Sequence, residues 1–167
     1  GAAWTSVNIG GAAAGHGATV EGGLYAIDNH VWLASALGYI YHSADYGVSW
    51  AVQEGGTIFA TSYAQIKFLN KNYGMAVTTV GNSVVTFNGG VNWAACTAFA
   101  AAQNNICVEV PQENMALVGN NLGGLWITYD AGTTWEAIAW DLTGAGTLNN
   151  IKRAPENDHC LWMLHNT

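Results

Sequence analysis

The sequence predicts an all-β protein made of repeated four-stranded antiparallel sheets. The first observation is a motif that recurs with offsets of 43 and 42 residues, as SADYGVSW (Ser43–Trp50), TFNGGVNW (Thr86–Trp93) and TYDAGTTW (Thr128–Trp135). The second is an Asn in a polar turn that recurs with offsets of 43, 42 and 43 residues, at Asn29, Asn72, Asn114 and Asn157. Two markers in phase indicate one structural unit repeated along the chain.

The third observation is the alternation of strand-like runs and turns within each unit. In the third unit, short β-rich runs at 105–111, 115–120, 125–130 and 135–140 alternate with polar or Gly-rich turns. This pattern predicts four short strands, and no segment reads as a capped amphipathic helix of useful length. Four strands per unit of about 42 residues is the size of a β-propeller blade, with the motif on the turn between the third and fourth strands.

The repeat divides the chain into units at about 5–50, 51–93, 94–135 and 136–167, the last joined by 1–4. Gly1 to Trp4 (GAAW) match the second half of the motif, so 1–9 is expected to supply an outer strand. Segments 149–155 and 159–166 supply two strands of the last unit, which lacks a third strand and half a motif. We favour an excerpt of a longer propeller over a four-unit ring or a ring completed by several copies.

The motif Ser/Thr-x-Asp-x-Gly-x-Ser/Thr-Trp resembles the Asp-box, or BNR repeat, of sialidases, sortilin-like receptors and photosystem-assembly-factor-like propellers. The first and third complete copies keep its Asp as Asp45 and Asp130, whereas the second is degenerate, with Asn88 at that place. The resemblance covers essentially the whole chain. It implies that the motif is a structural hairpin away from the ligand face.

The residue types explain the motif without catalysis. The Ser or Thr hydroxyl and the Asp carboxylate accept hydrogen bonds from nearby backbone N–H groups, the Gly supplies a positive φ, and the Trp buries its ring beneath the turn. His42, next to the first motif, is expected to be an ordinary, partly exposed His. The residues expected to have this structural role are Ser43, Asp45, Gly47, Trp50, Thr86, Asn88, Gly90, Trp93, Thr128, Asp130, Gly132, Trp135, Gly1 and Trp4.

Composition excludes several classes of function. The net charge is −7, and Lys plus Arg number four, so the chain lacks a basic footprint for nucleic acid or an anionic membrane. No apolar run approaches the roughly 20 residues that span a bilayer. The five His residues show no ligand spacing, and neither a metal nor a cofactor is expected. Cys96, Cys107 and Cys160 fit no zinc pattern, which leaves three buried thiols or one disulfide.

Enzymatic activity is not expected. Sialidases with this repeat clamp a carboxylate with three Arg residues, whereas this chain has Arg153 alone. A glycosidase needs two carboxylates at the same site. Only Glu54 and Asp141 lie where a loop would begin on the ligand-type face, in non-adjacent units. No residue is therefore assigned a catalytic role.

A binding or assembly surface remains. The loops that join successive units are neutral and rich in small and amide side chains, with aromatic residues nearby, a combination that suits neutral sugars. The possible ligand-face residues are Glu54, Tyr63, Asn104, Asn120, Asn121, Trp140 and Asp141. The leading hypothesis is a non-enzymatic structural or interaction propeller with protein partners or self-assembly, extracellular or on a virion surface. The alternative is a carbohydrate-binding, lectin-like propeller or a domain derived from a glycoside hydrolase.

Overall fold

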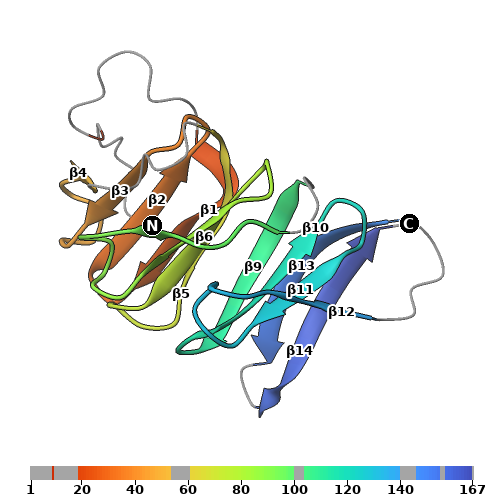
Figure 1. Cartoon of the computed structure of the whole chain (residues 1–167). Helices are drawn as coiled ribbons and strands as arrows, with labels where there is room; N and C mark the ends of the chain where they lie inside the picture. Colours follow the sequence, from red (N-terminus) through yellow and green to blue (C-terminus); the bar gives the residue numbers. More distant parts are fainter. Residues whose placement is uncertain are drawn as a thin grey trace, which may run out of the picture.

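A computed structural model describes residues 9, 19–53, 61–99, 104–139, 146–154 and 157–166. Within these ranges every regular element is a β-strand (Figure 1). No helix in the described part has the length and hydropathy that crossing a membrane requires. Gly1 and Trp4, and with them the expected outer strand at 1–9 apart from Ile9, lie outside the described residues.

Sheet 1 contains the first unit. Its strands are β1 (Thr19–Ile27), β2 (His30–Ser35), β3 (Ile40–Ser43) and β4 (Ala51–Val52), in the spatial order β1-β2-β3-β4. All neighbours are antiparallel, so each connection is a hairpin. The first motif occupies the β3–β4 connection, as the repeat predicts.

Sheet 2 repeats this order with β5 (Tyr63–Phe68), β6 (Gly74–Thr78), β7 (Ser83–Thr86) and β8 (Ala94–Ala95). Every residue of β6 and β7 is buried, because these middle strands are covered on both faces by neighbouring sheets. A strand covered on both faces reads as a continuous apolar run, as GMAVT and SVVT do.

Sheet 3 has β9 (Asn105–Gln112), β10 (Met115–Asn120), β11 (Leu125–Thr128) and β12 (Glu136–Ile138). The runs expected at 105–111 and 115–120 coincide with β9 and β10 to within one residue. Sheet 4 is partial, with β13 (Thr147–Ala154) paired to β14 (Asn157–Asn166). The prediction of an all-β chain with three four-stranded antiparallel sheets and an incomplete fourth is confirmed.

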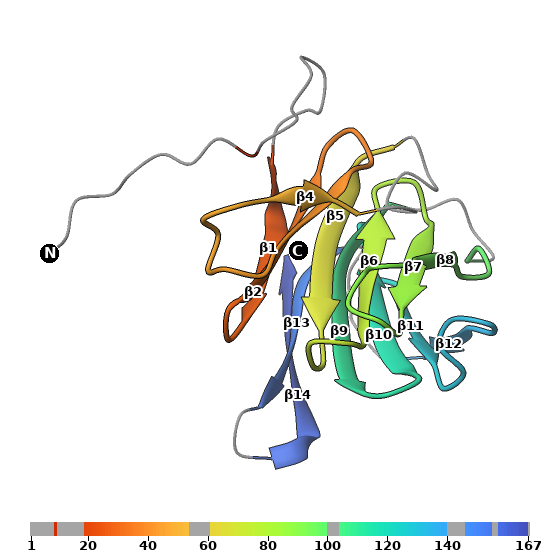
Figure 2. The same cartoon turned by 90° about the vertical axis from the view of Figure 1, so that its left-hand side faces the viewer.

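The sheets lie side by side in sequence order. The first strands β1, β5, β9 and β13 contact one another in turn, and sheets 2 and 3 extend outward from β5 and β9 to β8 and β12 (Figure 2). A cavity of about 490 Å³ is lined by residues from all four of these first strands. The first strands therefore surround a common central space.

The core consists of three layers, one between each pair of neighbouring sheets. Trp32 and Ile40 of sheet 1 pack against Ile66, Phe68 and Val84 of sheet 2. The second layer joins sheets 2 and 3 through Met75, Val77, Val108 and Val118, and the third joins sheets 3 and 4 through Leu117, Leu148 and Ile151. Each sheet is stabilised by its neighbours, as expected of a repeat architecture.

Candidate functional site

The first Asp-box turn is a closed network of hydrogen bonds. The Ser43 hydroxyl accepts from the backbone N–H of Gly47 (2.8 Å) and donates to Asp45 Oδ1 (2.7 Å). The Asp45 carboxylate accepts from the Ser49 backbone N–H (2.8 Å) and the Ser49 hydroxyl (2.6 Å). These hydrogen bonds, led by those from Ser49, lower the pKa of Asp45 to about 2. A carboxylate held ionised in this way is unsuited to act as a general acid.

The other two turns repeat the network with one difference. Thr86 and Thr128 accept from the backbone N–H groups of Gly90 and Gly132 at 2.8 and 2.9 Å. Asn88 Oδ1 accepts from the Asn92 backbone N–H (2.9 Å), so the degenerate copy keeps the turn with a neutral amide. Hydrogen bonds from Thr134 lower the pKa of Asp130.

The recurrent Asn residues join each box turn to the first hairpin of its own sheet. The carbonyl oxygens of Asn29, Asn72 and Asn114 accept from the backbone N–H groups of Tyr46 (2.9 Å), Gly89 (2.8 Å) and Ala131 (2.9 Å). Both markers therefore lie on one rim of the molecule, which we call the box rim.

Successive sheets are also linked across this rim. The Thr97 backbone N–H, just after β8, donates to the Gly132 carbonyl (2.8 Å), and the Thr97 hydroxyl donates to the Thr133 carbonyl (2.7 Å). In sheet 1, Gln53 directly follows the outer strand β4, and its side-chain amide donates to the Gly89 carbonyl (2.8 Å). The second and third box turns are thus each bound by a residue that follows the outer strand of the preceding sheet.

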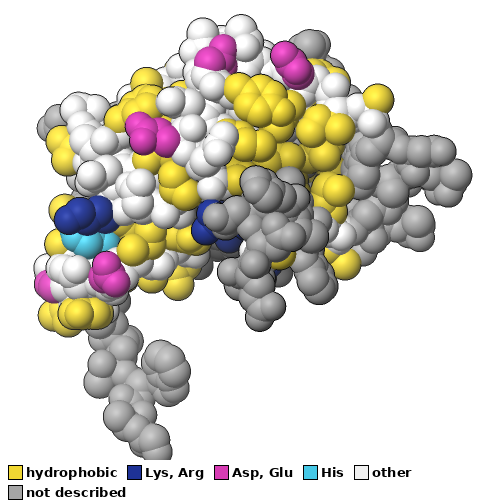
Figure 3. Space-filling model, turned by 90° about the horizontal axis from the view of Figure 1, so that it is seen from below, with side chains coloured by type: hydrophobic (Ala, Val, Ile, Leu, Met, Phe, Trp, Pro, Cys, Tyr) yellow, Lys and Arg dark blue, Asp and Glu magenta, His cyan; other side chains and the backbone are white. Residues whose placement is uncertain are grey.

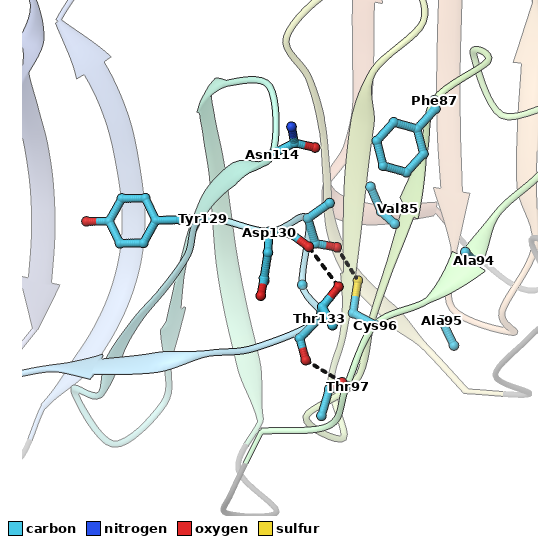
Figure 4. A pocket seen from close by; sticks show the side chains of 12 residues that line it. Val85, Phe87, Ala94, Ala95, Cys96, Thr97, Asn114, Tyr129, Asp130 and Thr133 are labelled. Carbon is cyan, nitrogen blue, oxygen red and sulfur yellow. Dashed lines mark hydrogen bonds between the residues drawn. The ribbon is translucent and has the colours of Figure 1, made fainter.

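A groove on the box rim lies between sheets 2 and 3 and measures about 600 Å³ (Figure 4). We call it the 2–3 groove. Phe87 and Tyr129, at the second position of their motifs, lie on its two sides with 52% and 62% of their surfaces exposed. Its remaining lining residues are Val85, Ala94, Ala95, Cys96, Thr97, Asn114, Asp130, Ala131, Gly132 and Thr133.

The polar groups of the 2–3 groove fit binding rather than covalent chemistry. Burial raises the pKa of the Cys96 thiol to about 11, so it is protonated at neutral pH and is a poor nucleophile. Asp130 is ionised and accepts hydrogen bonds from its own turn. A ligand in the groove would therefore meet hydroxyl, amide, aromatic and small aliphatic groups, together with the ionised Asp130.

The residues expected on the ligand face have mixed outcomes. Glu54, Trp140 and Asp141 lie outside the described residues. Tyr63 begins β5, and its side chain is fully buried. Its ring packs in the layer between sheets 1 and 2.

The amide residues of that face are used mainly in turns. Asn120 is buried, and its side-chain oxygen accepts from the backbone N–H groups of Leu122 (3.0 Å) and Gly124 (2.7 Å). The Asn104 side chain is exposed, and its carbonyl accepts from the Asn121 backbone N–H (3.0 Å). The structure brings Asn104 and Asn121 together and withdraws Asn120 from solvent.

Other groups with chemical potential are scattered. No group of three or more His, Cys, Asp or Glu side chains among the described residues is arranged to hold a metal. Cys96 and Cys107 are free thiols. Burial raises the pKa of Glu109 on β9, and the positive charges of Lys67, Arg153 and Lys152 oppose this shift.

The 2–3 groove was not predicted from the sequence. The sequence feature that could have indicated it is the second motif position. There Ala44, Phe87 and Tyr129 follow the Ser or Thr that begins each box. Two of these three are aromatic, an unusual choice for an exposed turn position. What the sequence does not show is that the outer strand of the preceding sheet runs alongside and encloses a groove.

Comparison with solved structures identifies the architecture. No family model and no curated protein matches the sequence. A structure described as YCF48 bound to D1 peptide matches with a TM-score of 0.64 and 18% identity, covering 83% of this chain and 46% of that one. YCF48 from Cyanidioschyzon merolae gives 0.62 and 18%, covering 79% of this chain and 47% of that one.

Two further matches have different origins. An ancestral GH74 enzyme gives a TM-score of 0.69 at 16% identity, covering 98% of this chain and 23% of that one. The computationally designed protein Ika4 gives 0.65 at 11% identity, covering 98% of this chain and 99% of that one. This chain spans less than half the length of the matched YCF48 structures. At such identities the likeness shows the fold alone, and that fold is a β-propeller of repeated four-stranded antiparallel sheets.

Proposed function

We propose that this chain is a non-enzymatic interaction propeller and that the 2–3 groove binds an extended segment of a partner protein. The observation that carries the proposal is the pair of exposed aromatic side chains, Phe87 and Tyr129, fixed on hydrogen-bonded turns on the two sides of the groove. Rigid aromatic anchors contribute much of the binding energy of protein interfaces at low entropic cost.

The edge of sheet 2 favours an extended segment as the occupant. β8 is the outermost strand of its sheet, and Ala94 and Ala95 are exposed along the groove. Small side chains leave the backbone of an edge strand accessible, and a peptide can add to such an edge as a further strand. The aromatic side chains would then provide pockets for alternate side chains of the peptide.

Two other observations support the proposal. One structure with this fold is described as bound to a peptide, which gives a precedent for peptide binding by a similar propeller. The lowered pKa values of Asp45 and Asp130 and the raised pKa of Cys96 remove these three groups as acid or nucleophile at neutral pH. An extracellular or virion-surface setting remains part of the proposal, on the basis of few charged residues and abundant Gly and Ala.

A neutral glycan is the second candidate. Tyr129 and Phe87 offer ring faces, and Asn114, Thr97 and Thr133 bring amide and hydroxyl groups to the same groove. Aromatic faces beside a few hydrogen-bonding groups suit sugar rings. In this second candidate the sugar would bind on the box rim and not at the loops that join successive units.

The test is selection of peptides from a random displayed library, followed by calorimetry with the selected peptides and a glycan array in parallel. We expect Phe87→Ala combined with Tyr129→Ala to weaken peptide binding by at least about tenfold, the loss expected of truncated anchor residues. Tyr46→Ala is the matched control, because Tyr46 is 77% exposed on the first box turn and does not line the 2–3 groove.

Three results would contradict the proposal. Peptides that bind the double variant as tightly as the original chain would place the site elsewhere. Glycan binding that depends on Tyr129, with no peptide selected, would favour the lectin-like alternative. Failure of both screens with correctly folded protein would leave a structural role in assembly.

A further inference from the structure

A second groove lies on the box rim between sheets 1 and 2, at the place equivalent to the 2–3 groove. It measures about 270 Å³, and we call it the 1–2 groove. The equivalence follows from the repeat offsets, since Gln53, Asn72, Asn88 and Gly89 line it where Cys96, Asn114, Asp130 and Ala131 line the 2–3 groove.

The side chains that line the 1–2 groove differ in charge from the equivalent residues of the other units. Asn88 stands where the third motif has Asp130, and Lys71 stands where the third unit has Glu113. His42 stands where the second unit has Val85. The described residues that line this groove include no carboxylate, although the chain as a whole has a net charge of −7. The space-filling view from below shows a histidine at one edge with a basic side chain on one side and acidic side chains on the other (Figure 3).

The wall of the groove carries a pair of histidines that share one hydrogen bond. His30 Nδ1 lies 2.9 Å from His42 Nε2, the ring planes differ by 14°, and the ring centroids are 5.1 Å apart. Because the centroid separation is close to the N···N distance plus two ring radii, the rings lie edge to edge with the bond in their common plane. Such a bond holds one proton, donated by one ring and accepted by the other.

The pair is held in place from beneath. The Trp32 ring stacks on His42 with centroids 5.0 Å apart and on Phe68 at 3.8 Å, and its Nε1–H donates to the Gly89 carbonyl (2.9 Å). Burial, and then the charge of His30, lower the pKa of His42, so an additional proton is unfavourable while the groove is empty. An anion bound in the groove would instead favour an additional proton on the pair, because opposite charges attract.

The other charged groups near the pair are few. Lys71 lies on the opposite wall, in the first hairpin of sheet 2. Asp28 is exposed in the turn that precedes His30, and Asp45 belongs to the turn that follows His42, where its carboxylate is bound by Ser43 and Ser49. Neither carboxylate lines the groove.

We propose that the 1–2 groove binds an oxyanion, a carboxylate or phosphate group, between Lys71 and the His30–His42 pair, which takes up a proton on binding. The site is independent of what occupies the 2–3 groove. Lys71 supplies a fixed positive charge, and the protonated pair supplies a second one. Asn72 and Asn88 add neutral amide side chains, and Asn88 takes the place of the acidic Asp130 of the 2–3 groove. Affinity therefore rises as pH falls, because the bound state holds one more proton than the free state.

The experiment is a titration of the whole chain with inorganic phosphate and, separately, with acetate, at pH 5.5 and 7.5. The readout is the NMR signal of the histidine ring protons. We expect saturable shifts of the His30 and His42 signals with either anion. Acetate stays ionised between pH 7.5 and 5.5, so its affinity should be up to about tenfold higher per pH unit of acidification where the pair takes up one proton. Phosphate gains a proton of its own in this range, so the pH dependence is measured with acetate. Preference for phosphate or for acetate distinguishes the two sources of the oxyanion.

Three surface variants, one of them a control, make the test specific. Lys71→Gln should weaken binding about tenfold, the effect of losing one close charge pair. Lys152→Gln is the matched control, since it removes the same charge from β13, outside the groove. Asn88→Asp should abolish binding by placing a carboxylate in the groove, while supplying the box turn with the Asp it has in the other two copies.

Lys71, Asn88 and Lys152 are all exposed, so none of the three substitutions alters the core. Asn88→Asp that binds phosphate and acetate as the original chain does, or Lys152→Gln that loses as much affinity as Lys71→Gln, would overturn the proposal. Histidine signals that do not respond to either anion at pH 5.5 would overturn it as well.

Discussion

The Gln53 side chain lies across the boundary between two sheets and is bound to Gly89 of the next box turn. Its amide nitrogen donates to the Gly89 carbonyl (2.8 Å), and its amide oxygen accepts from Trp93 Nε1 (3.3 Å). A side chain just beyond the outer strand of sheet 1 therefore holds both the turn and the Trp of the second motif. The motif is part of the contact between units as well as a hairpin within one unit.

This contact explains the glycine at the fifth motif position. Gly90 has φ +89°, and a Cβ there would collide with the Gln53 amide, whereas a Cβ at Gly47 (φ +85°) would come no closer than 3.5 Å to Trp50. Gly47→Ala should cost about 1–2 kcal/mol from the left-handed backbone alone. Gly90→Ala should cost about 1–3 kcal/mol more, through displaced Gln53 hydrogen bonds. Urea denaturation measures both, and equal losses would show that the inter-sheet contact contributes nothing.

The motif tryptophans should differ in their contribution to stability. Trp93 is only 7% exposed and meets Phe68 edge to face, with centroids 5.9 Å apart, whereas Trp50 is only half-buried. Trp93→Ala should lower the free energy of unfolding by about 3–5 kcal/mol, as expected for a large buried ring. Trp50→Ala should cost less. Chemical denaturation of the two variants checks the order, which the opposite ranking would refute.

Asp45 should stabilise the fold in a pH-dependent way. Its pKa is lowered to about 2 in the folded protein, chiefly by hydrogen bonds from Ser49 and Ser43, against about 3.9 in an unfolded chain. A carboxyl group whose pKa is lower in the folded protein contributes its full stabilisation at pH values above its pKa in the unfolded chain. It loses this contribution as the pH falls through its pKa in the folded protein. Asp45→Asn should therefore lower the thermal midpoint at pH 6 and have little effect near pH 2. A midpoint difference that is constant from pH 6 to pH 2 would contradict this.

The two described thiols should react at different rates. Cys107 is fully buried, and burial raises its pKa to about 12, against about 11 for the partly exposed Cys96. With iodoacetamide at pH 8, Cys96 should be alkylated slowly, because only about one thiol in a thousand is ionised, and Cys107 only after unfolding. Peptide mass spectrometry follows each site, with urea-denatured protein as the reference. Equal labelling of both in the folded chain would contradict the buried position of Cys107.

The period of the sequence determined the architecture. Each unit of about 42 residues has its own alternation of apolar runs and turns, and the turn residues are fixed by local chemistry. Ser43, Asp45 and Gly47 bond to one another or to backbone groups within a few residues, so their roles can be inferred without knowledge of the rest of the chain. The strands of the third unit could be located for the same reason.

Only the tertiary structure decided which side chains meet across strands and between units. Tyr63 reads as a loop aromatic near a ligand face, yet neighbouring sheets cover it completely. The His30–His42 pair joins residues 12 positions apart, and Gln53 contacts a residue 36 positions away. Such contacts depend on strand register and on the close approach of one sheet to the next, which sequence spacing does not encode. The grooves exist for the same reason, because each is formed by the outer strand of one unit and the box turn of the following one.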